Sequence, residues 1–228
     1  MLVRIGLLKK KPNWGTEEFR AHWASRHGPL ARQLSGLRGY VQNYVVRREH
    51  KAFDFPRGPE DFDGFSQLWF DDEAAMRGAV ATDLGRALVA DESHFIGELR
   101  IALVRQDAII APENGRSCVK LMCLLRRRPE IGAEQFQEEW GDPRRSPIGT
   151  IPGVRGIRQN IIVAREVPKG SPAGYERLPI DAIVELWFDR PEALASAFSS
   201  SEGRQMIARY RDLVAEITPF LVEPYVVV

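Results

Sequence analysis

The sequence lacks several features that would each point to a particular class of protein. Only two cysteines occur in 228 residues, Cys118 and Cys123. Their spacing on a predicted strand points them to opposite faces, which excludes a disulfide between them. No apolar run approaches the ~18 residues of a membrane-spanning helix, and the first residues become charged too soon for a signal peptide. We therefore expect a cytoplasmic protein with reduced thiols and no membrane partner.

An excess of charge of either sign is also missing. The chain has 32 basic and 31 acidic residues, a formal net charge of +1. A polyanion such as nucleic acid is therefore not an expected partner. The sequence shows no glycine-rich phosphate loop, no metal-ligand spacing and no nucleophile elbow. These absences predict a protein that uses no cofactor and no metal.

What the sequence does contain is an internal repeat. Pro12 matches Pro129 and Trp23 matches Trp140, both with an offset of 117 (129 − 12). Further on, QLWFDD at 67–72 matches ELWFDR at 185–190 with an offset of 118, which one inserted residue explains. We therefore predict two units, over residues 1–110 and 118–228, joined by a turn-rich linker at 111–117.

Each unit reads as strand, helix, strand, strand, helix, strand. In the first unit the pattern predicts strands at 3–8, 39–46, 64–70 and 98–105, a helix beginning at Thr16, and a second helical stretch over 71–97. This order is the ferredoxin-like βαββαβ unit, whose helices cover only one face of an antiparallel sheet. The predicted fold class is α+β, with the tandem units packed sheet to sheet as an eight-stranded intramolecular barrel.

Several stretches resemble a known family. EEFRAHWASRHGPLARQLSGLRGYVQN, DGFSQLWFDDEAAM and DESHFIGEL are similar to the EthD domain of the dimeric α+β barrel superfamily. The second unit keeps IPGVRGIRQN and DAIVELWFD but departs at His-Gly-Pro, so it resembles a degenerate second copy. The resemblance implies relatives among cofactor-free isomerases of muconolactone type, cofactor-free monooxygenases of polyketide quinones, and haem-binding enzymes.

His27 is the leading candidate for chemistry. At 100° per residue, Phe19, Trp23 and His27 share one inward-facing stripe of the first helix. The pair Gly28-Pro29 is predicted to end that helix just after His27. One interpretation of His27 is a cap on helix-end carbonyls, a role that Arg144 at the matching position would share. The other is a general acid/base, which the resemblance to muconolactone-type isomerases favours.

Tyr40, at the start of the second strand, is the second catalytic candidate. Its hydroxyl could donate a hydrogen bond to a substrate carbonyl or enolate, although an aromatic ring that fills the core is the alternative. Its repeat partner is Ile157, so the second unit loses this polar group together with the histidine. That joint loss suggests that His27 and Tyr40 act together. The aromatic side chains of Phe19, Trp23 and Trp69 are predicted to shape the pocket wall or the core behind it.

Three further residues are candidate substrate contacts. Asn43 and Asp63 recur in the second unit, as Asn160 and Asp181, which favours structural roles for them. His94 could approach the pocket from the second helical stretch, and exposure to solvent is the alternative.

These observations leave different classes of function open. One is a cofactor-independent enzyme, an isomerase or lyase acting by proton transfer or a cofactor-free oxygenase, on a small apolar carbonyl, lactone or quinone-like metabolite. Another is a non-catalytic protein that binds a small hydrophobic metabolite for a catabolic pathway. The superfamily adds a haem protein with His27 or His94 as ligand. His22 and His27, about 140° apart on a helix, are not expected to bind one metal. Either a monomer or a homodimer is expected.

Overall fold

A computed structural model describes residues 1–48, 54–111, 119–141 and 151–228. The first unit contains β1 (Leu2–Lys10), α1 (Thr16–His22), the π-helix η1 (Trp23–His27), α2 (Gly28–Ala31), β2 (Gly39–Arg47), β3 (Gly64–Phe70), α3 (Glu73–Val80), α4 (Asp83–Phe95) and β4 (Ile96–Ile110). The second contains β5 (Val119–Arg127), α5 (Ala133–Trp140), β6 (Val154–Glu166), the 3₁₀ turn η4 (Tyr175–Arg177), β7 (Ala182–Phe188), α6 (Pro191–Ser199), α7 (Ser201–Tyr210) and β8 (Val214–Val226).

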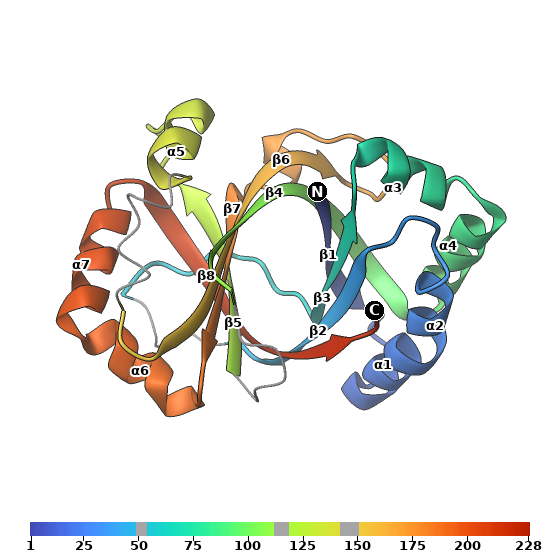
Figure 1. The fold of residues 1–228 in the computed structure, drawn as a ribbon, viewed down its shortest axis with the longest axis horizontal. Helices are drawn as coiled ribbons and strands as arrows, with labels where there is room; N and C mark the ends of the chain where they lie inside the picture. The colour runs from blue at the N-terminus through green and yellow to red at the C-terminus, as the bar shows by residue number, and fades with distance from the viewer. Residues whose placement is uncertain (49–53, 112–118, 142–150) are drawn as a thin grey trace.

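The eight strands close into one barrel, in the order β1-β3-β2-β8-β5-β7-β6-β4. The pairs β2 with β8 and β4 with β6 join the two units edge to edge, and both are antiparallel. Helices α1 to α4 lie on one outer side of the barrel, and α6 and α7 lie on the opposite side (Figure 1). The predicted α+β barrel of tandem ferredoxin-like units is thus confirmed. The predicted linker at 111–117 lies outside the described residues, apart from Ala111.

Strand alternation sorts the side chains of β1 between two environments. Val3, Ile5 and Leu7 point into the barrel, where they join an apolar cluster with residues of both units. Because successive side chains of a strand face opposite ways, Arg4 and Leu8 point outward, toward the helices of the first unit. The candidate site lies on this outward, helix-covered face.

The barrel interior also holds a polar network that spans the two units. Lys120 Nζ lies 2.7 Å from Glu185 Oε2, and both side chains are almost fully buried, at 2% and 0% exposure. Lys120 also donates to Asn43 Oδ1 at 2.8 Å, and Gln67 Nε2 donates to Glu185 Oε1 at 2.7 Å. Gln67 and Glu185 occupy matching positions of the repeat, so the two copies of one residue meet across the barrel. This network occupies the interior where the two sheets face each other.

The first helix does not end at Gly28-Pro29 as predicted. It passes from α1 through the π-helix η1 into α2, and the chain stays helical to Ala31. The Gly28 N–H donates to the carbonyl of Trp23, five residues earlier, which is the π-helical pattern. A proline inside an α-helix loses a hydrogen bond and clashes with the carbonyl four residues before it. Here the chain passes Pro29 within a helix, directly after the wider π turn.

Among the helices of the described ranges, none has both the length and the apolarity that spanning a bilayer requires.

Candidate functional site

The first unit encloses a small cavity between its helices and the outer face of its sheet. Its volume is about 40 Å³, room for about three water molecules. Polar side chains line it from both layers: Arg4, His27, Tyr40, Ser66, Glu92 and Lys169. Apolar walls such as Leu68, Leu88 and Leu99 surround them. The cavity therefore presents charged and hydrogen-bonding groups within an apolar enclosure, as binding sites commonly do.

The π-helix η1 places Trp23 and His27 against the sheet. The ring of Trp23 packs directly on Gly64 of β3, where an added Cβ would lie 2.4 Å from the ring. The carbonyl of Trp23 accepts a hydrogen bond from Gln42 Nε2 at 2.8 Å, which ties the helix to β2. His27, one π turn further on, is buried with 7% exposure and lines the cavity. A glycine on the strand and a π turn on the helix thus allow the close approach.

Asp91 on α4 holds the imidazole of His27. The His27 Nδ1 lies 2.9 Å from Asp91 Oδ2, and the second carboxylate oxygen binds His22 Nε2, also at 2.9 Å. Because a carboxylate only accepts hydrogen bonds, Nδ1 of the neutral His27 ring carries the proton. Nε2 keeps its lone pair, which no group of the described residues binds. One carboxylate thus binds both His22 and His27, although the two lie about 140° apart on a regular helix.

Burial governs the protonation of His27. The apolar surroundings lower the pKa of the imidazole, and the nearby ammonium of Lys169 lowers it further. The carboxylates of Glu92 and Asp91 act in the opposite direction, but burial is the stronger effect. His27 is therefore neutral at pH 7, the state that a general base requires.

Tyr40 is placed to donate a hydrogen bond. Its hydroxyl oxygen lies 2.9 Å from Trp23 Nε1 and 3.2 Å from Gln42 Nε2. The indole N–H can only donate, and the amide nitrogen of Gln42 also faces the acceptor carbonyl of Trp23, so both groups donate to Tyr40. Burial raises the pKa of Tyr40, which keeps the phenol protonated. With both lone pairs in use, the hydroxyl proton is available to an acceptor in the cavity.

Three charged groups at this cavity, Arg4, Glu92 and Lys169, were not predicted from the sequence. Lys169, on the loop after β6 of the second unit, binds both carboxylate oxygens of Glu92, at 2.6 and 2.7 Å. Arg4 projects from β1 and is 8% exposed, and its Nη2 is buried without a hydrogen-bond partner in the described part of the chain. The second unit, which resembles a degenerate copy, thus contributes Lys169 to the site of the first.

A signal for two of the missed residues was present in the repeat. Arg4 aligns with Leu121, and Glu92 aligns with Tyr210. Comparing the repeats position by position identified His27 and Tyr40. The same comparison would have found Arg4 and Glu92, because their charged groups are absent from the second copy. Lys169 has no such signal, because its loop reaches the cavity only through the folding of the whole barrel.

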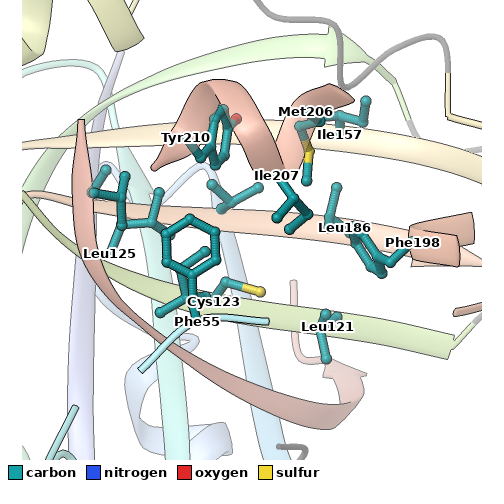
Figure 2. Close-up of a cluster of buried hydrophobic side chains, with 14 of the residues drawn as sticks. Phe55, Leu121, Cys123, Leu125, Ile157, Leu186, Phe198, Met206, Ile207 and Tyr210 are labelled. Carbon is teal, nitrogen blue, oxygen red and sulfur yellow. The ribbon is translucent and has the colours of Figure 1, made fainter. Parts of the chain in front are cut away.

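The equivalent region of the second unit is filled with apolar side chains. Leu121, Ile157 and Leu186 pack with residues of α6 and α7 in one buried cluster (Figure 2). Trp140 is retained from the repeat, but its buried Nε1 has no hydrogen-bond partner among the described residues, since Ile157 stands where Tyr40 would be. Arg144, the counterpart of His27, lies outside the described ranges.

The structure does not bring all the predicted site residues together. Phe19 packs behind Trp23, with ring centroids 5.4 Å apart. Asn43 lies inside the barrel, and Trp69 donates to Gln106 there, because strand alternation turns both away from the helices. Asp63 accepts a hydrogen bond from the Lys10 backbone at 3.0 Å.

His94 is likewise not at the cavity. It is exposed on α4, with Nδ1 2.9 Å from the carbonyl of Ala90 one helical turn earlier. Of the eight predicted site residues, Trp23, His27 and Tyr40 line the cavity.

A surface groove adjoins the cavity. It has a volume of about 410 Å³ and lies between α3, α4, β4 and the loop that carries Lys169. Glu92 and Lys169 line both the groove and the cavity, so their ion pair stands between the two. Within the described ranges, no group of three or more His, Cys, Asp or Glu side chains is arranged to hold a metal ion.

Comparisons with known proteins agree with this architecture. An anthrone oxidase-like protein is similar with a TM-score of 0.65 at 10% identity, over 99% of this chain and 93% of that chain. A proposed monooxygenase from Lactobacillus acidophilus NCFM has a TM-score of 0.60 at 10% identity, over 99% of this chain and 94% of its own. At such identities the likeness establishes the fold alone.

One further solved structure and two sequence comparisons complete the picture. A family protein of the ethyl tert-butyl ether D (EthD) type from Bacillus halodurans C-125 is 27% identical over 45% of this chain and 94% of its own, with a TM-score of 0.36. Among curated proteins, none matches the chain. The EthD domain model matches residues 11–98 and again 128–209. The chain therefore belongs to the EthD domain family and carries two copies of its domain.

Proposed function

We propose that this protein is a cofactor-independent enzyme that moves a proton on a small carbonyl compound. One observation carries the proposal: Asp91 fixes His27 as a neutral base whose Nε2 is free, in a cavity that it shares with the available hydroxyl proton of Tyr40. A base and a hydrogen-bond donor facing one enclosed space are the groups that enolisation requires.

The chemistry follows from these two groups. The substrate carbonyl accepts the hydrogen bond of Tyr40, and His27 Nε2 removes a proton from the adjacent carbon. The negative charge moves to the carbonyl oxygen, where Tyr40 stabilises it as an enolate. Asp91 stabilises the imidazolium that forms, as the carboxylate of a catalytic triad does. Return of the proton to a different carbon completes an isomerisation, and loss of a leaving group completes an elimination.

The dimensions of the site limit what it binds. A cavity of about 40 Å³ accepts only the reacting end of a metabolite, while the adjoining groove of about 410 Å³ has room for an apolar body. A haem group does not fit this cavity, which is far below the ~300 Å³ of the smallest typical ligand pockets. His94 is an unsuitable ligand as well, because its imidazole is exposed and already binds a backbone carbonyl.

Exchange of carbon-bound hydrogen tests the proposal before the natural substrate is known. The protein is incubated in D₂O with a panel of small lactones, enones and hydroxyquinones, and loss of the signals of hydrogens next to the carbonyl is followed by ¹H NMR. We expect exchange of at least one compound by the wild type, and loss of that exchange in His27→Gln. His94→Gln, which changes the exposed histidine of α4, is the matched control and should exchange like the wild type.

Other outcomes would identify a different protein. Binding of panel compounds without exchange would contradict catalysis and support a binding protein. Exchange that survives in His27→Gln would remove His27 from the mechanism. The same proton abstraction also begins a cofactor-free oxygenation, so uptake of O₂ during the assay would assign that reaction in place of isomerisation.

A further inference from the structure

Arg4 is a buried cation with an unused hydrogen-bond donor. Arg4 is 8% exposed and lines the cavity. Its Nη2 has no hydrogen-bond partner in the described part of the chain. Leaving a buried donor unsatisfied is destabilising, and more so for a charged group. A guanidinium is seldom kept in this state unless something else completes its hydrogen bonds.

The nearby carboxylates are already engaged. Both carboxylate oxygens of Glu92 accept hydrogen bonds from Lys169 Nζ, at 2.6 and 2.7 Å. Glu166 accepts a hydrogen bond from the Gly170 N–H at 2.9 Å. Both carboxylates compensate the charge of Arg4 through space, but neither forms a hydrogen bond with its Nη2. Arg4 Nη2 is thus available to donate a hydrogen bond to a ligand that enters the cavity.

The sheet register places Arg4 beside the proposed catalytic donor. Arg4 pairs with Leu68 across β1 and β3, and Leu68 pairs with Tyr40 across β3 and β2. The three residues form one row on the helix-covered face, so Arg4 and Tyr40 approach the cavity from either side of Leu68. Arg4 and Tyr40, each with a donor that the described residues leave unused, therefore line the same cavity.

The second unit shows that the fold does not need this charge. The corresponding row is Leu121, Leu186 and Ile157, all apolar and buried. Leucine at the position of Arg4 is compatible with the same strand pairing and helix packing. Arg4 is therefore a feature of the first unit's cavity and not of the barrel.

We infer that Arg4 binds a carboxylate of the substrate, which makes the substrate class small carboxylic acids with a carbonyl or enone close to the acid group. The carbonyl or enone in this description rests on the proposed function. The carboxylate site itself does not depend on catalysis. A guanidinium binds a carboxylate through charge-assisted hydrogen bonds, which are stronger than neutral ones. The cavity volume of about 40 Å³ suits such a compact, polar end of a molecule.

Matched pairs of acids and amides test the inference. Acetate with acetamide, and crotonate with crotonamide, are titrated into the protein, and binding is followed by the indole N–H resonance of Trp23, the group that donates to Tyr40. We expect the wild type to bind each acid about 10- to 100-fold more tightly than its amide. Arg4→Leu should bind acid and amide equally weakly, and Arg4→Lys, which keeps the charge without the planar fork, should retain part of the preference.

Control variants keep this test independent of the proposed function. Because Leu121 shows that leucine fits, Arg4→Leu should fold, which its thermal unfolding and the dispersion of its spectrum verify. His94→Gln should keep the preference for acids, since it changes an exposed residue away from the cavity. Equal affinity of the wild type for acid and amide, or an undiminished preference in Arg4→Leu, would overturn the carboxylate site. Neither result would affect hydrogen exchange of neutral carbonyl compounds, so failure here is distinguishable from failure of the proton-transfer proposal.

Discussion

Asp91 binds two histidines of the same helical segment, His27 through one carboxylate oxygen and His22 through the other, each at 2.9 Å. The segment can present both rings to α4 because its second half is π-helical. A short departure from α-helical geometry thus accompanies Pro29 within the helix. It also places His27 where Asp91 can orient its imidazole. π-Helical turns of this kind are frequent at functional sites.

Replacing Asp91 with asparagine should reduce catalysis strongly while keeping the fold. An amide can turn its NH₂ group toward His27, which favours the wrong tautomer and removes the charge that stabilises the imidazolium. We expect the rate of proton exchange to fall about 10²- to 10⁴-fold in Asp91→Asn. His94→Gln on the same helix is the control. An Asp91→Asn variant with the wild-type rate would show that the His27–Asp91 pair has no catalytic role.

The depressed pKa of His27 predicts a specific dependence of stability on pH. The unfolded chain has an ordinary histidine pKa near 6.5, and burial lowers the folded value below it. Below pH 6.5 the unfolded state therefore binds more protons at this site, so the free energy of unfolding falls as the pH falls toward the folded pKa. His27→Gln removes this contribution.

Urea unfolding at several pH values measures the effect. Between pH 7.5 and pH 5, the wild type should lose more stability than His27→Gln does. For the same reason, the acid limb of the exchange rate should lie below pH 6.5. A larger loss of stability in the variant, or an acid limb above 6.5, would mean that His27 is stabilised as a cation.

Tyr40 supports the structure as well as the proposed chemistry. Phenylalanine at this position removes the acceptor of the buried Trp23 indole N–H, so we expect Tyr40→Phe to lower the free energy of unfolding by about 1–3 kcal/mol. Tyr225→Phe, at a tyrosine that is 45% exposed, should change it by less than about 0.5 kcal/mol. Chemical denaturation checks both. If the two variants were equally stable, the bond between Trp23 and Tyr40 would contribute nothing to folding.

The ion pair inside the barrel predicts a double-variant result. Lys120→Val leaves the Glu185 carboxylate buried without its cation, which should cost about 3–5 kcal/mol of stability. The first unit has Val3 and Gln67 at these two positions. Lys120→Val combined with Glu185→Gln copies that pair, so we expect the double variant to recover at least half of the loss in urea unfolding. A double variant less stable than Lys120→Val would contradict this reading of the network.

The barrel could be predicted from the sequence because it depends on patterns that repeat. The offset of 117 to 118 residues between matching segments predicts the two units. Local alternation predicts strands such as 64–70, and the structure contains this strand as β3. The end of the first helix was wrong because Gly28-Pro29 normally stops an α-helix, and a π turn cannot be recognised from composition.

The site could be predicted only in part, since its residues come from distant segments. Comparing the repeats identified His27 and Tyr40, which line one cavity. Asn43 and Trp69 lie on the other face of their strands. Because both faces of these strands are covered, the sequence pattern does not show which face points to the helices. The Lys169 contribution depends on closure of the whole barrel, and so no local pattern indicates it.

The protonation of His27 tests the central claim most directly, because the proposed chemistry requires a neutral ring with a free Nε2. Long-range ¹H–¹⁵N NMR of the histidine side chains, with His27 assigned through His27→Gln, reports both the charge and the tautomer at pH 7. We predict a neutral imidazole that carries its proton on Nδ1, toward Asp91, and changes to the Nε2-protonated tautomer or to a mixture in Asp91→Asn. An imidazolium at pH 7, or a wild-type ring with its proton on Nε2, would contradict the account.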